Sequence, residues 1–120
     1  MEFFDNDIIR SEASEMMRLY EDIQDLMLSH KFRTQEGGVK YINMMERLLE
    51  LQEMIYFRAK YSDKRDAKEF VEMLVRTLPL VSREGETDAG QVFRRMRSEI
   101  ADMKKLVEEE SWHHPQDLVL

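Results

Sequence analysis

Carboxylate side chains are the residues of this chain that could most readily hold a metal. A helical bundle binds a pair of iron ions when inward-facing glutamates combine with two Glu-x-x-His motifs in the middle of helices. The sequence contains one Glu-x-x-His, formed by Glu110 and His113. The other candidate carboxylates fall mainly on or beside polar helix faces: Glu12, Glu15, Glu46, Glu50 and Glu53. We therefore expect solvated helix charges, with no metal and no cofactor.

The side chains that carry out nucleophilic catalysis are also absent or scattered. Cysteine is missing, and the three histidines are His30, His113 and His114. A Ser–His–Asp arrangement needs a rigid fold to bring its members together, whereas Ser and Asp occur here chiefly where they would cap helices. The glycine pair at 37–38 is not followed by the Lys-Ser/Thr of a phosphate-binding loop. The sequence predicts a protein that is not an enzyme.

Basic residues gather at one point of an otherwise acidic chain. Arg94, Arg95 and Arg97 lie close together, although the net charge is -7. Contact with nucleic acid needs basic charge to dominate a surface, because affinity follows the number of phosphates neutralised. Glu99 and Asp102 interrupt this cluster. A solvated helix face, a docking patch for a partner protein and a nucleic-acid contact all remain open, with nucleic acid the least favoured.

Methionine is unusually frequent, with ten residues in 120, and tryptophan occurs once, as Trp112. Flexible thioether side chains fill irregular cores, and they also suit adaptable binding surfaces. The methionines therefore indicate either core filling or a groove that accepts a partner helix. Trp112 precedes an aliphatic end and could equally serve as a docking motif or fold back on the core.

Apolar residues recur at alternating spacings of three and four, which predicts helices that pack in the manner of a coiled coil. We expect long helices over residues 5–29 and 39–61, joined by a turn at Gly37-Gly38 into an antiparallel hairpin. A shorter helix is expected over 63–77, ended by Pro79. A loop over 79–87 and a fourth helix over 87–110 follow. The prediction is an all-α, four-helix bundle-like domain over residues 1–110, with a flexible tail over 111–120.

The first two helices carry more apolar surface than one neighbour each can cover. Their apolar arcs span about half the circumference or more at 100° per residue. This surplus predicts a homodimer whose seam includes five residues: Tyr20, Met44, Met45, Leu48 and Ile55. No apolar run approaches the roughly 18 residues of a membrane span. With no cysteine, the composition is typical of a soluble protein of a reducing compartment such as the cytoplasm.

Short motifs occur in a fixed order along the chain: Phe3-Phe4-Asp5, Ile8, Glu12-Ala13, Tyr20, Lys31-Phe32, Glu36-Gly37, Met45-Glu46, Ser62-Asp63, Gln91-Val92-Phe93-Arg94-Arg95-Met96, Ile100 and Met103-Lys104. In this order, over roughly residues 3–106, the chain resembles an uncharacterised family of small proteins from cyanobacteria and their phages. It departs from that pattern over 66–88, which is longer, and after Glu110, where a tail is added. The family has no established activity, so the resemblance assigns no functional residue. It implies a cytoplasmic protein that acts on a host component if it is phage-encoded.

These observations together predict a non-catalytic protein–protein interaction module. Docking of a helix in a groove is the expected mechanism, with selectivity from Arg94, Arg95 and Arg97 or from Trp112. The alternative is a dimeric regulator that contacts nucleic acid through the face from Arg94 to Arg97.

Overall fold

The computed structural model describes residues 2–109. Helical segments make up its regular structure: η1 (Phe3–Asp5), α1 (Asp7–Met27), η2 (His30–Arg33), α2 (Gln35–Lys60), α3 (Arg65–Val81) and α4 (Ala89–Glu108). No strand occurs in this part of the chain, so the predicted all-α, bundle-like fold is confirmed. The predicted tail at 111–120 lies outside the described residues. No helix within 2–109 is long and apolar enough to cross a bilayer.

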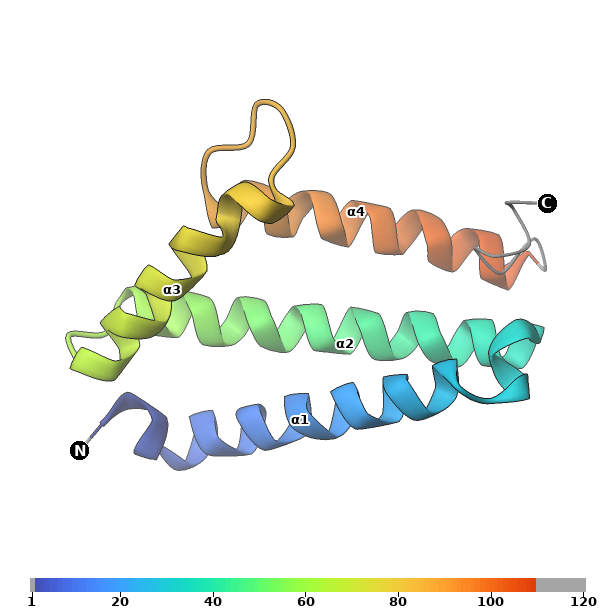
Figure 1. Ribbon diagram of the computed structural model, residues 1–120, viewed down its shortest axis with the longest axis horizontal. Helices are drawn as coiled ribbons and strands as arrows, with labels where there is room; N and C mark the ends of the chain where they lie inside the picture. The colour runs from blue at the N-terminus through green and yellow to red at the C-terminus, as the bar shows by residue number, and fades with distance from the viewer. Residues whose placement is uncertain (1, 110–120) are drawn as a thin grey trace.

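Helix α2 is the centre of the molecule. α1 packs antiparallel along one side of α2 and α4 packs antiparallel along the other, while α3 crosses obliquely beside them (Figure 1). The thinnest dimension is 20 Å, about two helix diameters. The arrangement is therefore a flat layer of three helices with a partial second layer supplied by α3.

The core consists of two clusters, one on each side of α2. Ile55 and Ala59 pack with Ile9 and Ala67 where α1, α2 and α3 meet. On the other side, four aliphatic residues join α2 to α4: Ile42, Leu49, Ile100 and Val107. Because both clusters use α2, its buried residues cover about half of its circumference at 100° per residue, as the sequence predicted.

The turn of the hairpin differs from the prediction. Gly37 and Gly38 lie inside the first turn of α2, and residues 28–34 make the connection. Thr34 caps α2, because its Oγ1 accepts a hydrogen bond from the N–H of Gly37 at 3.0 Å. Phe32 is buried and its ring meets Tyr41 edge-on with centroids 5.2 Å apart. A buried aromatic and a threonine cap hold the turn, so glycine is not needed for its backbone conformation.

The end of α3 also differs from the prediction, because Pro79 lies within the helix, which continues to Val81. Proline removes one intrahelical hydrogen bond, and the helix nevertheless closes with the N–H of Ser82 donating to the Leu78 carbonyl at 2.8 Å. Arg95 on α4 then donates to the carbonyl of Val81 at 2.6 Å. This contact from a distant helix supports the last turn of α3, and the following loop is correspondingly shorter than expected.

Asp66 attaches the amino-terminal segment to α3. Its carboxylate accepts hydrogen bonds from the N–H groups of Phe3 and Phe4, both at 2.9 Å. The ring of Phe4 packs against Phe70 with centroids 5.5 Å apart. Burial alone would raise the pKa of Asp66, but the backbone hydrogen bonds from Phe4 and Phe3 outweigh it and lower this pKa below its usual value of 3.8.

Acid is expected to release this amino-terminal attachment. A carboxyl whose pKa is depressed by folding stabilises the protein above its unfolded pKa, and the contribution is lost as the pH falls through the lower, folded pKa. The attachment should therefore weaken below about pH 4. Amide hydrogen exchange at Phe3 and Phe4, measured from pH 6 to pH 3, should show this loss of protection.

The matched variant is Asp66→Asn, which keeps the shape but removes the charge. It should show weak protection of both amides already at pH 6, with little further change on acidification. Protection that stays high in Asp66→Asn would contradict the assigned role of the carboxylate.

Candidate functional site

The surface feature most suited to binding is an apolar groove over α2. One part of it is a hollow of about 460 Å³ lined by residues of all four α-helices, chiefly Met16, Met17 and Tyr20 of α1, Gln52 and Ile55 of α2, Phe70, Met73 and Leu74 of α3, and Phe93 of α4. A neighbouring hollow of about 290 Å³ lies between α2 and α4 and is lined mainly by Met45, Leu48, Met96 and Met103. Gln52 lines both. We call the two hollows together the methionine groove.

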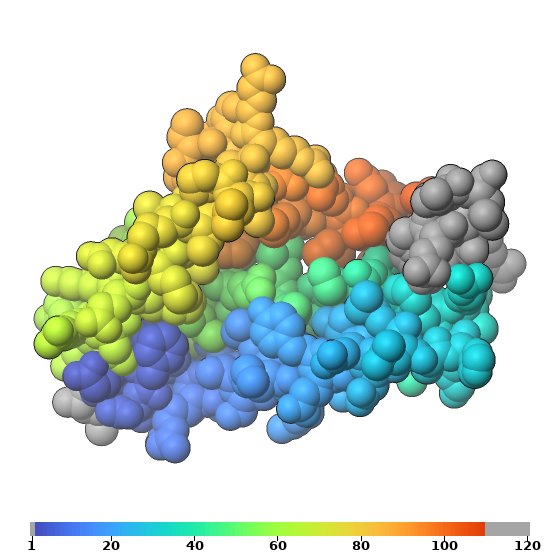
Figure 2. Space-filling model, viewed as in Figure 1, coloured from blue at the N-terminus to red at the C-terminus, as the bar shows by residue number. Residues whose placement is uncertain are grey.

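The groove exists because α2 is recessed between its neighbours. In the space-filling view, α2 lies deeper than α1 on one side and α4 on the other (Figure 2). α3 covers only the part of α2 that approaches Lys60, where Ala67 is fully buried. The hydroxyl of Tyr20 accepts a hydrogen bond from Gln52 Nε2 at 3.0 Å, which ties α1 to α2 where the two hollows meet.

Methionines form much of the walls. Met17 and Met73 are 62% and 47% exposed, and they face the groove from α1 and α3. Met45, Met96 and Met103 are half-buried and lie over the packed residues between α2 and α4. Since methionine side chains are flexible and polarizable, these walls can adapt to the shape of an apolar ligand.

The structure brings together four of the five residues predicted for a dimer seam. Tyr20 and Ile55 line one hollow, and Met45 and Leu48 line the other. However, Leu48 is 6% exposed and Ile55 is 3% exposed, because the chain's own helices cover them. One chain therefore covers most of the surface of these two side chains, and their place in a dimer seam stays a prediction. Met44 is half-buried and outside both hollows.

The predicted arginine cluster is largely engaged within the chain. Arg95 Nε lies 2.9 Å from Glu86, and its guanidinium also reaches Glu99 at 3.3 Å. Arg97 pairs with Glu53 of α2 at 3.0 Å. Arg94 is exposed, and within residues 2–109 no ion pair is found for it. The cluster thus consists of two arginines in ion pairs and one accessible cation. Trp112 lies outside the described residues.

Two carboxylates of α1 form ion pairs with arginines of α2. Glu15 accepts hydrogen bonds from Arg47 at 2.5 and 3.0 Å, and Glu12 pairs with Arg58. The hydrogen bond from Arg47 lowers the pKa of Glu15, against the opposing effect of burial. Among the described residues, no group of three potential ligands is placed to hold a metal ion.

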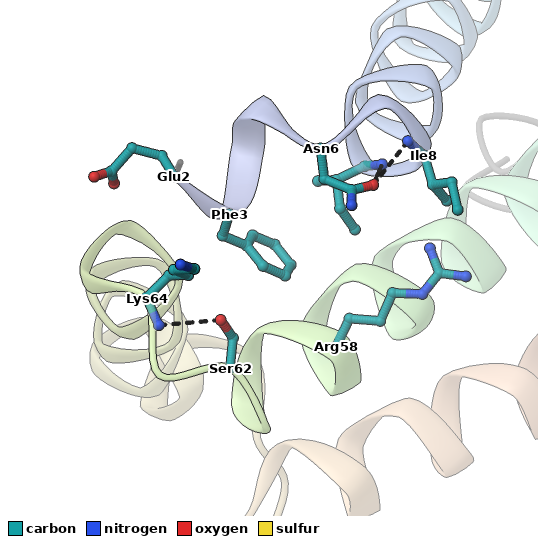
Figure 3. Close-up of a pocket in the computed structure, with 8 residues that line it drawn as sticks. Glu2, Phe3, Asn6, Ile8, Arg58, Ser62 and Lys64 are labelled. Atoms are coloured by element: carbon teal, nitrogen blue, oxygen red, sulfur yellow. Dashed lines mark hydrogen bonds between the residues drawn. The ribbon is translucent and has the colours of Figure 1, made fainter.

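A second cavity, of about 470 Å³, lies where the amino terminus meets the end of α2, bordered by Phe3, Arg58 and Lys64 (Figure 3). Arg58 is paired with Glu12, and the Ser62 hydroxyl accepts the backbone N–H of Lys64 at 3.1 Å. Because Arg58 and Ser62 already have partners within the protein, this cavity offers less to a ligand than the methionine groove.

Sequence reasoning did not identify Met17, Gln52, Met73 and Phe93 as site residues. The available signals were the high methionine content and the position of Met17 beside the main apolar stripe of its helix. Neither signal shows which helices meet, and the site is formed by four of them.

In a comparison with known families, the family model of a domain of unknown function, DUF1825, matches residues 1–107 of the chain. The chain belongs to the DUF1825 family. The match reaches the last turn of α4, so the DUF1825 region includes every residue named above in the methionine groove. No curated protein and no solved structure matches the chain. The expectation of an uncharacterised family is therefore confirmed.

Proposed function

We propose that this DUF1825 protein is a non-catalytic interaction module that binds a helix of another polypeptide in the methionine groove. The observation that supports the proposal most strongly is the hollow of about 460 Å³ lined by all four α-helices, with methionines on its walls. Exposed apolar patches bounded by helices are a common feature of protein-binding surfaces. A helix fits such a groove by placing side chains at spacings of three and four into it.

The fold itself contains an example of this mode of packing. α3 lies across the layer of α1, α2 and α4 with Ala67, Phe70 and Leu74 directed toward it, at the spacing of three and four. The uncovered part of the same surface continues beyond α3, toward Met45 and Met103. A partner helix would extend the second layer that α3 begins.

The partner proposed here is a cellular protein. In line with the resemblance to proteins of cyanobacteria and their phages, we place the interaction in the cytoplasm, with a host protein as the partner if the gene is carried by a phage. A homodimer through the groove is the competing arrangement. The nucleic-acid alternative is weaker, because Arg95 and Arg97 are neutralised by Glu86 and Glu53.

Charged substitutions inside the groove test the proposal. The double variant Met17→Lys/Met73→Lys should reduce capture of the partner from a lysate at least about tenfold, because binding would bury two unpaired ammonium groups. Both side chains are about half exposed in the free protein, so the fold should tolerate the changes. Quantitative affinity capture, with circular dichroism as a check of folding, measures the effect.

The control is Leu28→Lys/Val75→Lys, which places the same charges at exposed apolar positions outside the groove. It should capture the partner as the natural sequence does. Equal capture by the groove variant and the control would show that binding does not use the groove.

A further inference from the structure

Methionine sulfur is the group of this protein that an oxidant can change most readily. The sequence contains no cysteine, the other side chain that peroxide oxidises easily. Residues 2–109 contain nine methionines, and six of them line the methionine groove, three in each hollow. Oxidation of methionine would therefore act mainly on this one surface.

Solvent exposure divides these methionines into two groups. Met17, Met27 and Met73 are 62%, 52% and 47% exposed, whereas the other six within residues 2–109 are half-buried. Met17 and Met73 line the same hollow from α1 and α3, while Met27 ends α1 and lies outside both hollows. Since oxidation depends on the access of the oxidant to sulfur, Met17 and Met73 are the groove residues that peroxide reaches first.

We propose that Met17 and Met73 are oxidation sites through which hydrogen peroxide closes the methionine groove to apolar ligands. The sulfur lone pair attacks one peroxide oxygen, an S–O bond forms and the O–O bond breaks. The sulfur loses two electrons and the peroxide gains them. The proton of the transferred oxygen passes to the departing hydroxide, which leaves as water. The inference rests on the proposed function and adds a means of regulating it.

The product, methionine sulfoxide, is polar, and sulfoxide reductases convert it back to methionine. The polar residues that line this hollow are Tyr20, Gln52 and Thr77. The amide of Gln52 already donates to the Tyr20 oxygen at 3.0 Å, and the Thr77 hydroxyl donates to the Leu74 carbonyl at 2.8 Å. An apolar ligand would displace water from the sulfoxide and bury it with few donors nearby, which opposes binding.

Limited oxidation followed by peptide mapping tests the reactivity of each sulfur. The folded protein is treated with hydrogen peroxide for increasing times, and mass spectrometry gives the sulfoxide fraction at each methionine. Met17, Met27 and Met73 should react several-fold faster than the half-buried methionines, and this difference should disappear in concentrated urea. Rates at Met17 and Met73 no higher than those at Met45 and Met103 would overturn the inference.

A synthetic peptide tests the effect on binding. It has about 18 residues, roughly 27 Å as a helix, with leucines at spacings of three and four and glutamine elsewhere. Oxidation of Met17 and Met73 should weaken its binding at least about tenfold, because each sulfoxide loses its water under the peptide. Fluorescence anisotropy measures the dissociation constant, and circular dichroism should show that the fold is unchanged. Treatment with a sulfoxide reductase and a thiol should restore binding.

Three variants assign the effect to named sulfurs. Met17→Leu/Met73→Leu keeps the walls apolar without an oxidisable sulfur at these positions, so it should bind the peptide equally before and after peroxide. Met27→Leu is the matched control, because it removes the exposed methionine outside the groove, and it should lose binding on oxidation as the natural sequence does. Met17→Gln/Met73→Gln introduces uncharged polar groups and should bind weakly without peroxide.

The outcomes separate this inference from the proposed function. Unchanged binding by the oxidised natural sequence would overturn the inference, as would loss of binding in oxidised Met17→Leu/Met73→Leu, and neither result counts against the reduced groove. If the peptide does not bind even the reduced protein, oxidation has no apolar binding to remove and the inference fails. Capture of the partner from a lysate then decides the proposed function independently.

Discussion

Replacing Gly37 with alanine should destabilise the protein by at least about 3 kcal/mol, the upper part of the range for overpacked positions. A Cβ atom at Gly37 would lie 1.7 Å from the carbonyl oxygen of Lys31. Since that atom belongs to the backbone, it cannot move aside as a side chain would, and the turn at 28–34 must shift as a unit. Chemical denaturation followed by circular dichroism would measure the loss in the free energy of unfolding.

The comparison variant is Gly90→Ala, in the first turn of α4. A Cβ there would lie 3.1 Å from a carboxylate oxygen of Asp88, a side-chain atom that can yield by a few tenths of an ångström. The gain in helix propensity, up to about 1 kcal/mol, offsets this contact, so the net change should be small. Comparable losses in the two variants would contradict the close approach of Lys31 to α2.

Leu51→Ala should cost about 2–5 kcal/mol, the usual range for a leucine in a core. Leu51 is completely buried in the middle of α2, the helix on which α1, α3 and α4 all pack. Removal of its side chain leaves a cavity that long, rigid helices cannot readily close. Thermal and urea unfolding would report the change.

Leu28→Ala is the matched control for this variant. Leu28 is 83% exposed and follows the end of α1, so the same truncation removes a side chain that remains largely in water. The change in the free energy of unfolding should lie within about 0.5 kcal/mol. A large loss at Leu28 would show that another polypeptide covers this position in solution.

The groove and the core overlap at Ile55, but other residues of α2 belong to only one of them. Leu51 is fully buried and Ile42 nearly so, whereas Gln52 and Met45 line the groove. Substitutions in the walls at Met17 and Met73 can therefore change binding without unfolding the protein. This separation is what makes the proposed interaction testable by mutation.

Much of the fold could be predicted from local patterns. The alternating three and four spacing placed each of the long helices to within a few residues, and Asp88 begins α4 through the capping arrangement with Gln91. The two local errors, at Gly37 and Pro79, have one cause. Both residue types usually break helices. Here the cap from Thr34 in the adjoining turn keeps Gly37 helical. The hydrogen bond from Arg95 of α4 to the Val81 carbonyl supports the helix around Pro79.

The sequence by itself determined that the chain is helical, which residues of each helix are apolar, and that α2 has too much apolar surface for one neighbour. The periodicity of a helix encodes these properties locally. Only the tertiary structure decided that α1 and α4 take opposite sides of α2, that α3 covers the part of α2 near Lys60, and that the chain's own helices bury Leu48 and Ile55. An apolar stripe specifies that a face is to be covered, but it does not specify which helix covers it, because hydrophobic burial has no direction.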